Sequence, residues 1–265
     1  MYVTIAIGRE GLGNLCFQVA AILGYAEQHG HTPVFVREWF TEQQEQRDHP
    51  GPCHIRDMFP TIQIVDKLLD YQILKEQPAY APLPYCAKHV KLEGYFQSEK
   101  YFPSYRMETP LFQTKNQPKQ KAIFLHVRRG DYLHPLNKHH AVDLRAYYRR
   151  ALSATLEPGM SVLVCSDDIP WCKDHLPTMY GDLVQNWQWA EGTDVETLED
   201  MSLCEYGGIC ANSSFSWWGG YWNTSPKKIL CMPDTWGYPP FPPFQDIYPK
   251  GVYVLPVSGS VSGSS

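Results

Sequence analysis

Two adjacent arginines and an aspartate follow directly after an apolar run in the segment AIFLHVRRGDYLHP, residues 122–135. Arg128 and Arg129 carry planar, permanently charged guanidinium groups, which match phosphate oxygens two at a time. Gly130 permits a tight turn, and Asp131 is placed to orient one arginine through an ion pair. We interpret the arginines as binding groups for a phosphate. The alternative is a surface Arg–Asp pair, which contributes little in water.

A second polar cluster follows the apolar run SVLVC and consists of Ser166, Asp167 and Asp168. A carboxylate at the end of a strand can accept hydrogen bonds from the N–H edge of guanine or from ribose hydroxyls. The alternative is helix capping, because Ser or Asp before the Pro170 of a predicted helix satisfies unpaired backbone N–H groups. Capping explains one aspartate and leaves the other open.

A third cluster lies in ICANSSFSWWGG, where Asn212, Ser213, Ser214 and Ser216 separate an apolar run from a predicted helix. The N–H groups and the positive dipole end of such a helix favour a phosphate. Simple capping by one serine accounts for one of these four residues. We expect the tryptophans that follow to pack in the core.

The elements that position these clusters are predicted by alternation of strand-like and helix-like segments in the second half. In chain order the segments are 122–127, helix 142–155, 161–168, a helix from Pro170, 183–187, helix 196–204, 207–214, helix 215–223 and 227–236. This alternation is typical of a parallel sheet with helices on its faces. Ligands of such sheets bind at the carboxyl ends of the strands. The three clusters together therefore predict a cradle for a nucleoside diphosphate.

The first half opens with a predicted β-α-β unit over residues 2–8, 13–30 and 32–36. Its glycine-containing turn does not complete the GxGxxG pattern of dinucleotide sites, because Cys16 stands where the third glycine is needed. Residues 37–120 are irregular, with strand candidates at 62–66 and 89–96. The polar segment 114–121 is the predicted interdomain linker.

Composition excludes several classes of protein. The 265 residues carry a net charge of −5, which does not fit a general nucleic-acid binder. The 8 cysteines form no CxxC pairs, so we expect buried, reduced thiols and no metal site. The sequence shows no signal peptide or membrane span. We expect a cytoplasmic protein, free in solution or peripheral to a membrane face.

Four segments carry a resemblance to a known family: GLGNLCFQVA (11–20), LEGYFQSEKYF (92–102), HVRRGDY (126–132) and MSLCEYGGICANSSFSWWGGYWN (201–223). With them the chain resembles the α-1,2-fucosyltransferases, which transfer L-fucose from GDP-fucose to a galactoside. One departure is visible, since Leu15 and Cys16 follow Asn14 where the family pattern has Gln and Met.

The resemblance implies an α/β protein of the GT-B type, with two Rossmann-like domains facing across a cleft. The expected domains are an acceptor-side domain over 1–118, a GDP-fucose-binding domain over 119–256 and a flexible tail over 257–265. The implied reaction is an inverting, metal-independent transfer from GDP-β-L-fucose to O2 of a terminal galactose. GDP-fucose and a galactose-terminated glycan are the expected partners, without any cofactor or nucleic acid.

The resemblance also assigns site residues. Catalytic roles are implied for Arg128, Asn14 and Asp131. Donor binding is implied for His126, Arg128, Arg129, Ser166, Asp167, Asp168, Asn212, Ser213, Ser214, Phe215 and Ser216. Acceptor binding is implied for Gly13, Asn14 and Gln97. The general base stays open between Asp131, Glu10 and Glu99, or a phosphate oxygen of the donor.

Three alternative functions remain at this point. The first is a fucosyltransferase that forms another linkage. The second is a metal-dependent glycosyltransferase with Asp167 and Asp168 as ligands, although their adjacent positions differ from the spaced DxD of such sites. The third is a GDP-sugar or glycan-binding protein without catalysis.

Overall fold

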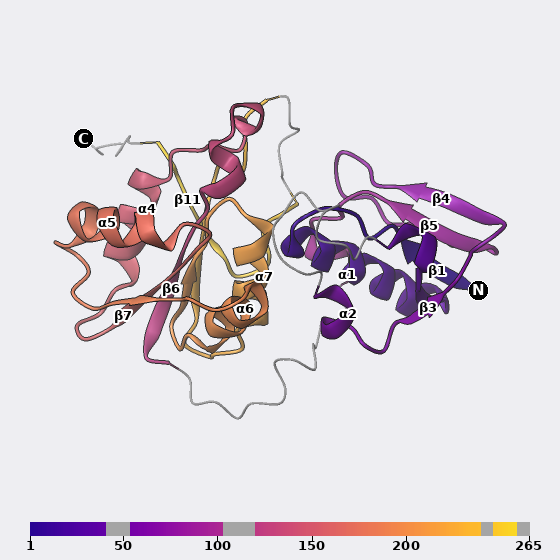
Figure 1. The fold of residues 1–265 in the computed structure, drawn as a ribbon, viewed down its shortest axis with the longest axis horizontal. Helices are drawn as coiled ribbons and strands as arrows, with labels where there is room; N and C mark the ends of the chain where they lie inside the picture. Colours follow the sequence, from indigo (N-terminus) through magenta and orange to yellow (C-terminus); the bar gives the residue numbers. More distant parts are fainter. Residues whose placement is uncertain (41–53, 103–119, 240–245, 259–265) are drawn as a thin grey trace. The chain divides into compact units, whose positions relative to one another are not determined.

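The computed structural model describes residues 1–40, 54–102, 120–239 and 246–258. The chain divides into two compact units, of which the first comprises 1–116 with 245–249 and the second 117–244 with 250–265. Each unit is built on a parallel sheet flanked by helices (Figure 1). The predicted α/β class with two Rossmann-like units is confirmed.

The first unit contains a five-stranded sheet in the order β3-β2-β1-β5-β4, with every described pairing parallel. Its strands are β1 (Tyr2–Ile5), β2 (Thr32–Val36), β3 (Gln63–Val65), β4 (Tyr71–Lys75) and β5 (His89–Glu93). Its helices are α1 (Leu12–His29), α2 (Ile55–Met58) and the 3-10 turns η1 (Arg37–Trp39) and η3 (Glu99–Tyr101). Helix α1 ends at Gly30, whose positive φ of 69° allows the left-handed cap.

The second unit contains a six-stranded parallel sheet in the order β11-β10-β9-β6-β7-β8. Its strands are β6 (Ala122–Val127), β7 (Ser161–Ser166), β8 (Trp187–Trp189), β9 (Gly207–Ile209), β10 (Ile229–Pro233) and β11 (Tyr253–Leu255). Its helices are η4 (Gly130–Leu133), η5 (Pro135–Asn137), α4 (Arg145–Thr155), α5 (Ile169–Tyr180), α6 (Asp194–Leu203) and α7 (Ser214–Trp222).

Helices cover both faces of the second sheet, with α4 and α5 on one face and α6 and α7 on the other (Figure 1). All six residues of β6 are buried, as expected for a central strand of a covered parallel sheet. Strand β6 lies between β9 and β7. The three polar segments that follow these strands therefore meet at one edge of the sheet.

The predicted strands at 32–36 and 122–127 are confirmed, and the helix predicted from Pro170 begins at Ile169. The strand predicted at 183–187 is wrong. The N–H groups of Leu183 and Val184 both donate to the carbonyl of Tyr180, so this segment closes the end of α5, and strand β8 starts only at Trp187. Strands β4 and β11 were not predicted.

The predicted domain boundary at 118 and most of the predicted linker lie outside the described residues, as does most of the predicted tail. A difference from the predicted domains concerns residues 246–249, which pack with the first unit. The reason is visible at Asp246, whose carboxylate accepts the Tyr80 N–H at 2.8 Å and pairs with Lys100. The first unit therefore includes a segment that follows β10 in the chain.

Seven cysteines lie within the described residues, and all seven are buried and outside disulfides, as the sequence predicted. Cys53 falls outside these residues.

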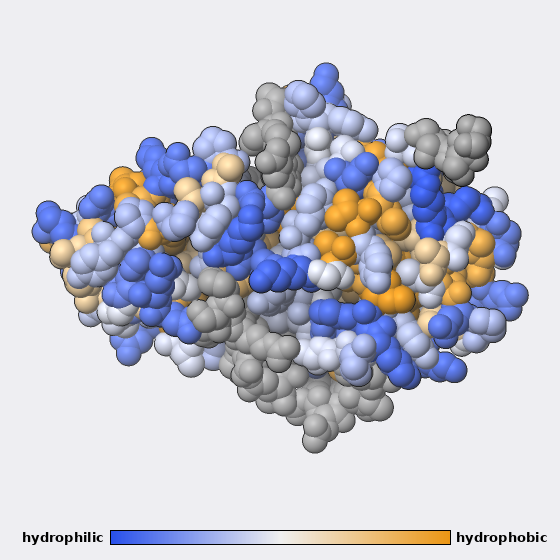
Figure 2. Space-filling view, turned by 180° about the vertical axis from the view of Figure 1, so that it is seen from behind, coloured by the Kyte–Doolittle hydropathy of each residue, from blue (hydrophilic) through white to orange (hydrophobic). Residues whose placement is uncertain are grey.

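The face shown in Figure 2 is largely hydrophilic and carries an apolar patch. Within the described ranges, no helix has both the length and the apolar character needed to cross a membrane.

Candidate functional site

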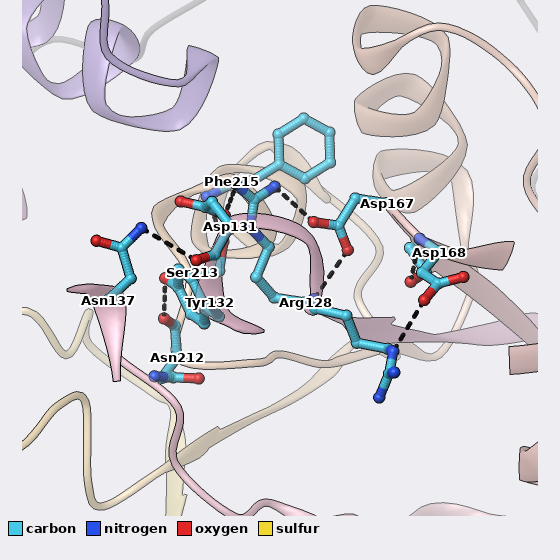
Figure 3. A network of polar contacts seen from close by, with 11 residues as sticks. Arg128, Asp131, Tyr132, Asn137, Asp167, Asp168, Asn212, Ser213 and Phe215 are labelled. Carbon is cyan, nitrogen blue, oxygen red and sulfur yellow. Dashed lines mark hydrogen bonds and ion pairs between the residues drawn. The ribbon is translucent and has the colours of Figure 1, made fainter. Parts of the chain in front are cut away.

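Arg128 follows β6 directly, and its guanidinium lies between two carboxylates (Figure 3). Nη2 is 2.5 Å from Oδ1 of Asp131, and Nη1 is 3.2 Å from Oδ2 of Asp167. Asp131 comes from the same turn, whereas Asp167 comes from the end of the neighbouring strand β7. The Arg128 side chain is only 20% exposed. Its orientation is therefore fixed by groups from two elements.

Arg129 is bound to the end of β7 through both its backbone and its side chain. Its backbone N–H donates to Oδ1 of Asp167 at 2.9 Å, and its Nε donates to Oδ2 of Asp168 at 3.0 Å. The guanidinium also lies 3.7 Å from the ring centroid of Trp171, a favourable cation–π contact. The turn after β6 is thus fastened to the turn after β7.

The two aspartates after β7 have different structural roles. Asp168 caps α5, because its Oδ1 accepts the Trp171 N–H at 3.2 Å, while Ser166 Oγ accepts the Asp168 N–H at 3.0 Å. Helix capping therefore explains the position of Asp168. The sequence had suggested this role for one of the two aspartates. Asp167 contacts the two arginines instead of the start of the helix.

The cluster is not the positively charged cradle that the arginines alone suggested. Arg128 and Arg129 contribute two positive charges, and three aspartates contribute three negative charges, which leaves 2 − 3 = −1. Burial alone would lower the pKa of Arg128, but the attraction of Asp167 and Asp131 outweighs it and raises that pKa. The arginines are permanently charged and already held in place.

The start of α7 supplies the third part of the site. Ser213 caps the helix, since its Oγ accepts the Phe215 N–H at 3.3 Å, and Ser214 and Phe215 are partly exposed in the first turn. This is the anion-favouring end of the helix. It lies at the carboxyl edge of the sheet, beside the turn that carries Arg128 (Figure 3).

Two predicted donor-binding residues have side chains in the interior of the second unit. The Asn212 side chain is buried and donates to the carbonyls of His140 and Trp236, both at 2.9 Å. The Ser216 hydroxyl is fully buried and donates to the Ser213 carbonyl at 3.2 Å. Both side chains hold the local backbone in place.

His126, the last but one residue of β6, is also buried. Burial of the ring, with a smaller effect of the Arg128 charge, lowers the pKa of His126 to about 3. Its ring lies 5.6 Å from that of Phe215, and its Nδ1 has no hydrogen-bond partner among the described residues. The imidazole is therefore neutral at ordinary pH and adds no positive charge to the site.

Two further residues hold the turn in place and were not predicted. The Tyr132 hydroxyl donates to the Asn212 carbonyl at 3.0 Å, and the Asn137 amide donates to the Asp131 carbonyl at 3.0 Å. These bonds fix η4 and η5 against the end of β9 and against each other. Tyr132 is the last residue of the HVRRGDY motif, so the sequence could have identified it as part of the site.

Two cavities lie at the strand ends of the second unit, and the smaller one adjoins the arginines. One of about 620 Å³ lies at the end of β7, and its lining includes Ser166, Asp167, Pro170, Lys173 and Glu191. Another of about 270 Å³ is lined by residues that include Arg128, Arg129, Tyr132 and Trp171. The larger one is within the usual volume range of small-molecule sites, about 300–1,000 Å³.

The predicted acceptor residues belong to the first unit. Asn14, at the start of α1, accepts a hydrogen bond through Oδ1 from Nε2 of Gln97 at 2.7 Å. Gly13 is buried beside Asn14. The structure thus joins two residues that are far apart in sequence, at the carboxyl ends of the adjacent strands β1 and β5. Phe96, before Gln97, is held at a positive φ of 55° in a buried position.

Residues 107–253 match the model of glycosyl transferase family 11. The chain belongs to this family. Its members are glycosyltransferases. Three relatives of known name are also similar to this chain. The O-antigen biosynthesis glycosyltransferase WbnK of Escherichia coli is 30% identical over 204 residues, covering 68% of this chain and 67% of WbnK.

An α-1,2-colitosyltransferase of E. coli is 28% identical over 164 residues, or 56% of each chain. A galactoside 2-α-L-fucosyltransferase of Caenorhabditis elegans is 26% identical over 264 residues, covering 83% of this chain and 69% of the relative. The matches thus span between 56% and 69% of the relatives' own lengths. Among solved structures, the α-1,6-fucosyltransferase NodZ with GDP is 14% identical, with a TM-score of 0.45 over 82% of this chain and 91% of NodZ.

This chain differs from the usual family pattern at the two residues that follow Asn14, and both of them lie in the core. Leu15 and Cys16, which follow Asn14, are both fully buried in α1. They therefore affect how the helix packs, while Asn14 itself stays partly exposed. Within the part of the chain that the structure describes, no three His, Cys, Asp or Glu side chains group as ligands for a metal ion.

Proposed function

We propose that this family 11 protein is an inverting α-1,2-fucosyltransferase, which transfers L-fucose from GDP-β-L-fucose to O2 of a terminal galactose. The supporting observation is Arg128, a partly buried guanidinium fixed at the end of the central strand β6 and beside the start of α7. The name of the C. elegans relative, a galactoside 2-α-L-fucosyltransferase, supports the same transferred sugar, acceptor class and linkage.

The donor diphosphate would lie against Arg128 and the first turn of α7. Guanidinium groups bind phosphate oxygens through charge-assisted hydrogen bonds, and the N–H groups at Ser213 and Ser214 add the favourable end of a helix dipole. The nucleoside would extend toward the end of β7, where the cavity of about 620 Å³ provides room. His126 would line the donor site as a neutral, buried ring.

The reaction would proceed by a single displacement. The acceptor hydroxyl oxygen attacks the anomeric carbon on the face opposite GDP, and the bond from that carbon to the phosphate oxygen breaks. The electron pair leaves with GDP, and the β-linkage of the donor becomes an α-fucoside. Arg128 would stabilise the negative charge that develops on the diphosphate, which is usually the largest contribution to catalysis.

The proton of the acceptor hydroxyl passes to a base. Asp131 is already paired with Arg128 at 2.5 Å, so we assign it an orienting role. Glu10, Glu99 and a phosphate oxygen of GDP remain the candidates for the base. The acceptor would be bound by the first unit, where Asn14 and Gln97 form a linked pair next to Gly13. A metal ion would not be required, because the oriented Arg128 guanidinium and the start of α7 would stabilise the charge that develops on the diphosphate.

The first experiment incubates the purified protein with GDP-fucose and lactose in the presence of EDTA and identifies the product by NMR. An α-fucose on O2 of galactose supports the donor, linkage, inversion and metal independence together. Activity that disappears in EDTA and returns with Mn²⁺ would favour the metal-dependent alternative. GDP binding without transfer to any galactoside would favour a binding protein.

A second candidate donor is GDP-colitose. The relative named α-1,2-colitosyltransferase matches over 164 residues and favours this possibility. Competition between equal amounts of GDP-fucose and GDP-colitose for one galactoside acceptor decides between them. The preferred donor is the one whose sugar predominates in the product, measured by mass spectrometry.

A further inference from the structure

Asp167 makes three close approaches to the turn that carries the phosphate-binding arginines. Its Oδ2 lies 3.2 Å from Nη1 of Arg128, and its Oδ1 accepts the Arg129 backbone N–H at 2.9 Å. The carboxylate also lies directly over the Cα of Gly130, so that a Cβ at this position would overlap it. The Asp167 carboxylate therefore lies against three consecutive residues of the turn, 128–130.

The neighbouring carboxylates do not duplicate this arrangement. Asp131 also contacts Arg128 but belongs to the same turn, so it cannot fix the turn relative to the sheet. Asp168 contacts Arg129 and caps α5. Asp167 joins the Arg128 guanidinium to the end of β7, a strand that pairs with β6 along its length.

We propose that Asp167 is a positioning residue, which aims the Arg128 guanidinium at the leaving diphosphate and does not read the guanine base. This inference rests on the proposed function, because it concerns the same donor site. It also explains why glycine stands at position 130, since the carboxylate occupies the space of a side chain.

The charge balance makes the proposal testable. Asp167→Asn keeps an oxygen that can accept the Arg129 N–H, but it removes one negative charge beside the diphosphate. If only charge mattered, the variant would bind GDP more tightly and transfer would be undiminished. A positioning role predicts that kcat falls on the order of 10–100-fold, while the Kd for GDP does not rise.

The decisive comparison uses GDP and IDP, which differ only in the 2-amino group of the base. Calorimetry on the wild type and Asp167→Asn gives both Kd values, and initial rates with GDP-fucose and lactose give kcat. An unchanged ratio of the GDP and IDP affinities together with the fall in kcat supports positioning. A loss of the preference for GDP with a higher Kd would overturn it in favour of base reading.

Gly130→Ala provides a second variant that keeps every charge. Its methyl group would displace the Asp167 carboxylate, so kcat should fall as in Asp167→Asn. Wild-type kcat in either folded variant would overturn the proposal, even if the variant unfolds at a lower temperature, because that result indicates a merely structural role. The control is Asp182→Asn, which breaks the exposed pair with Arg149 (2.6 Å) and should keep the wild-type kcat.

Failure of the proposed function would be recognised separately. A wild-type protein that binds GDP but transfers no fucose contradicts the proposed reaction, while the GDP and IDP affinities still decide whether Asp167 reads the base. A wild-type protein that does not bind GDP would overturn both proposals.

Discussion

Arg128 is the residue on which the proposed chemistry depends most. Its planar fork contacts two carboxylates through different nitrogens, at 2.5 and 3.2 Å, which a lysine ammonium could not reproduce in the same plane. The three aspartates around the two arginines leave the cluster with no excess of positive charge. Binding of a diphosphate therefore depends on the direction of the guanidinium rather than on the net charge of the site.

We expect Arg128→Ala to lower kcat for fucosyl transfer by roughly 10²–10³-fold, as removal of a main charge stabiliser does. Initial rates with GDP-fucose and lactose measure this loss. Arg149→Ala, which removes an exposed arginine of the same unit, is the control and should retain wild-type kcat. Near-normal turnover by folded Arg128→Ala would contradict the proposed role.

His126 predicts a pH dependence of stability. The folded protein holds the ring neutral, because its pKa is lowered to about 3, whereas the unfolded chain takes up a proton near the ordinary pKa of 6.5. Protonation therefore favours the unfolded state below that pH. The contribution of His126 to the free energy of unfolding is complete above pH 6.5 and is lost as the pH falls toward 3, by up to about 1.4 kcal/mol per pH unit.

Urea denaturation at a series of pH values from 7.5 to 4.5 measures this dependence. In His126→Gln the decrease in unfolding free energy with falling pH should be smaller by the contribution of one proton. The exposed His175→Gln serves as control and should follow the wild type. Equal slopes in wild type and His126→Gln would contradict the assignment.

At the scale of elements, the central strands were predictable because continuous burial produces continuous apolar runs, as in β6 and β7. The edge strands β4 and β11 were not, since half-exposed strands such as Tyr71–Lys75 lack such a run and depend on a neighbour for their hydrogen bonds. The clusters at the strand ends could be named from sequence. Which aspartate faces which arginine could not, because that depends on β6 lying between β9 and β7.

Helix α1 gives a prediction that opposes simple helix propensity. Replacing a glycine in the interior of a helix by alanine ordinarily stabilises the protein by about 0.5–1 kcal/mol. Gly24 lies in the interior of α1. Here an added Cβ would overlap the backbone carbonyl of Tyr101 in η3. We expect Gly24→Ala to lower the free energy of unfolding by about 1–3 kcal/mol, as overpacking does.

Chemical denaturation of Gly24→Ala and the wild type tests this expectation. The control is Gln28→Ala in the same helix, where the side chain is exposed and a change within about 0.5 kcal/mol is typical. A more stable Gly24→Ala protein would show that α1 and η3 separate at little cost. In that case the contact would not determine the position of the Asn14–Gln97 pair.

At the scale of the whole molecule, the chain forms two compact units, and the proposed donor-binding residues all belong to the second. GDP at 100 times its Kd stabilises the state that binds it by about 2.7 kcal/mol. We expect this to slow hydrogen exchange at the β6–η4 turn and at the start of α7, and to leave α1 and β2 unchanged. Mass spectrometry of exchange with and without GDP measures the difference; uniform slowing over both units would contradict a donor site confined to the second.

The return of residues 246–249 to the first unit has a consequence for protein synthesis. Asp246 accepts the Tyr80 N–H and pairs with Lys100, and Ile247 is buried, so the first unit lacks part of its packing until these residues are made. At 5–20 residues per second, the ribosome needs roughly 7–30 seconds to proceed from residue 102 to residue 246. The first unit is begun first, but its native structure can be completed only after residues 117–244 of the second unit have also been translated.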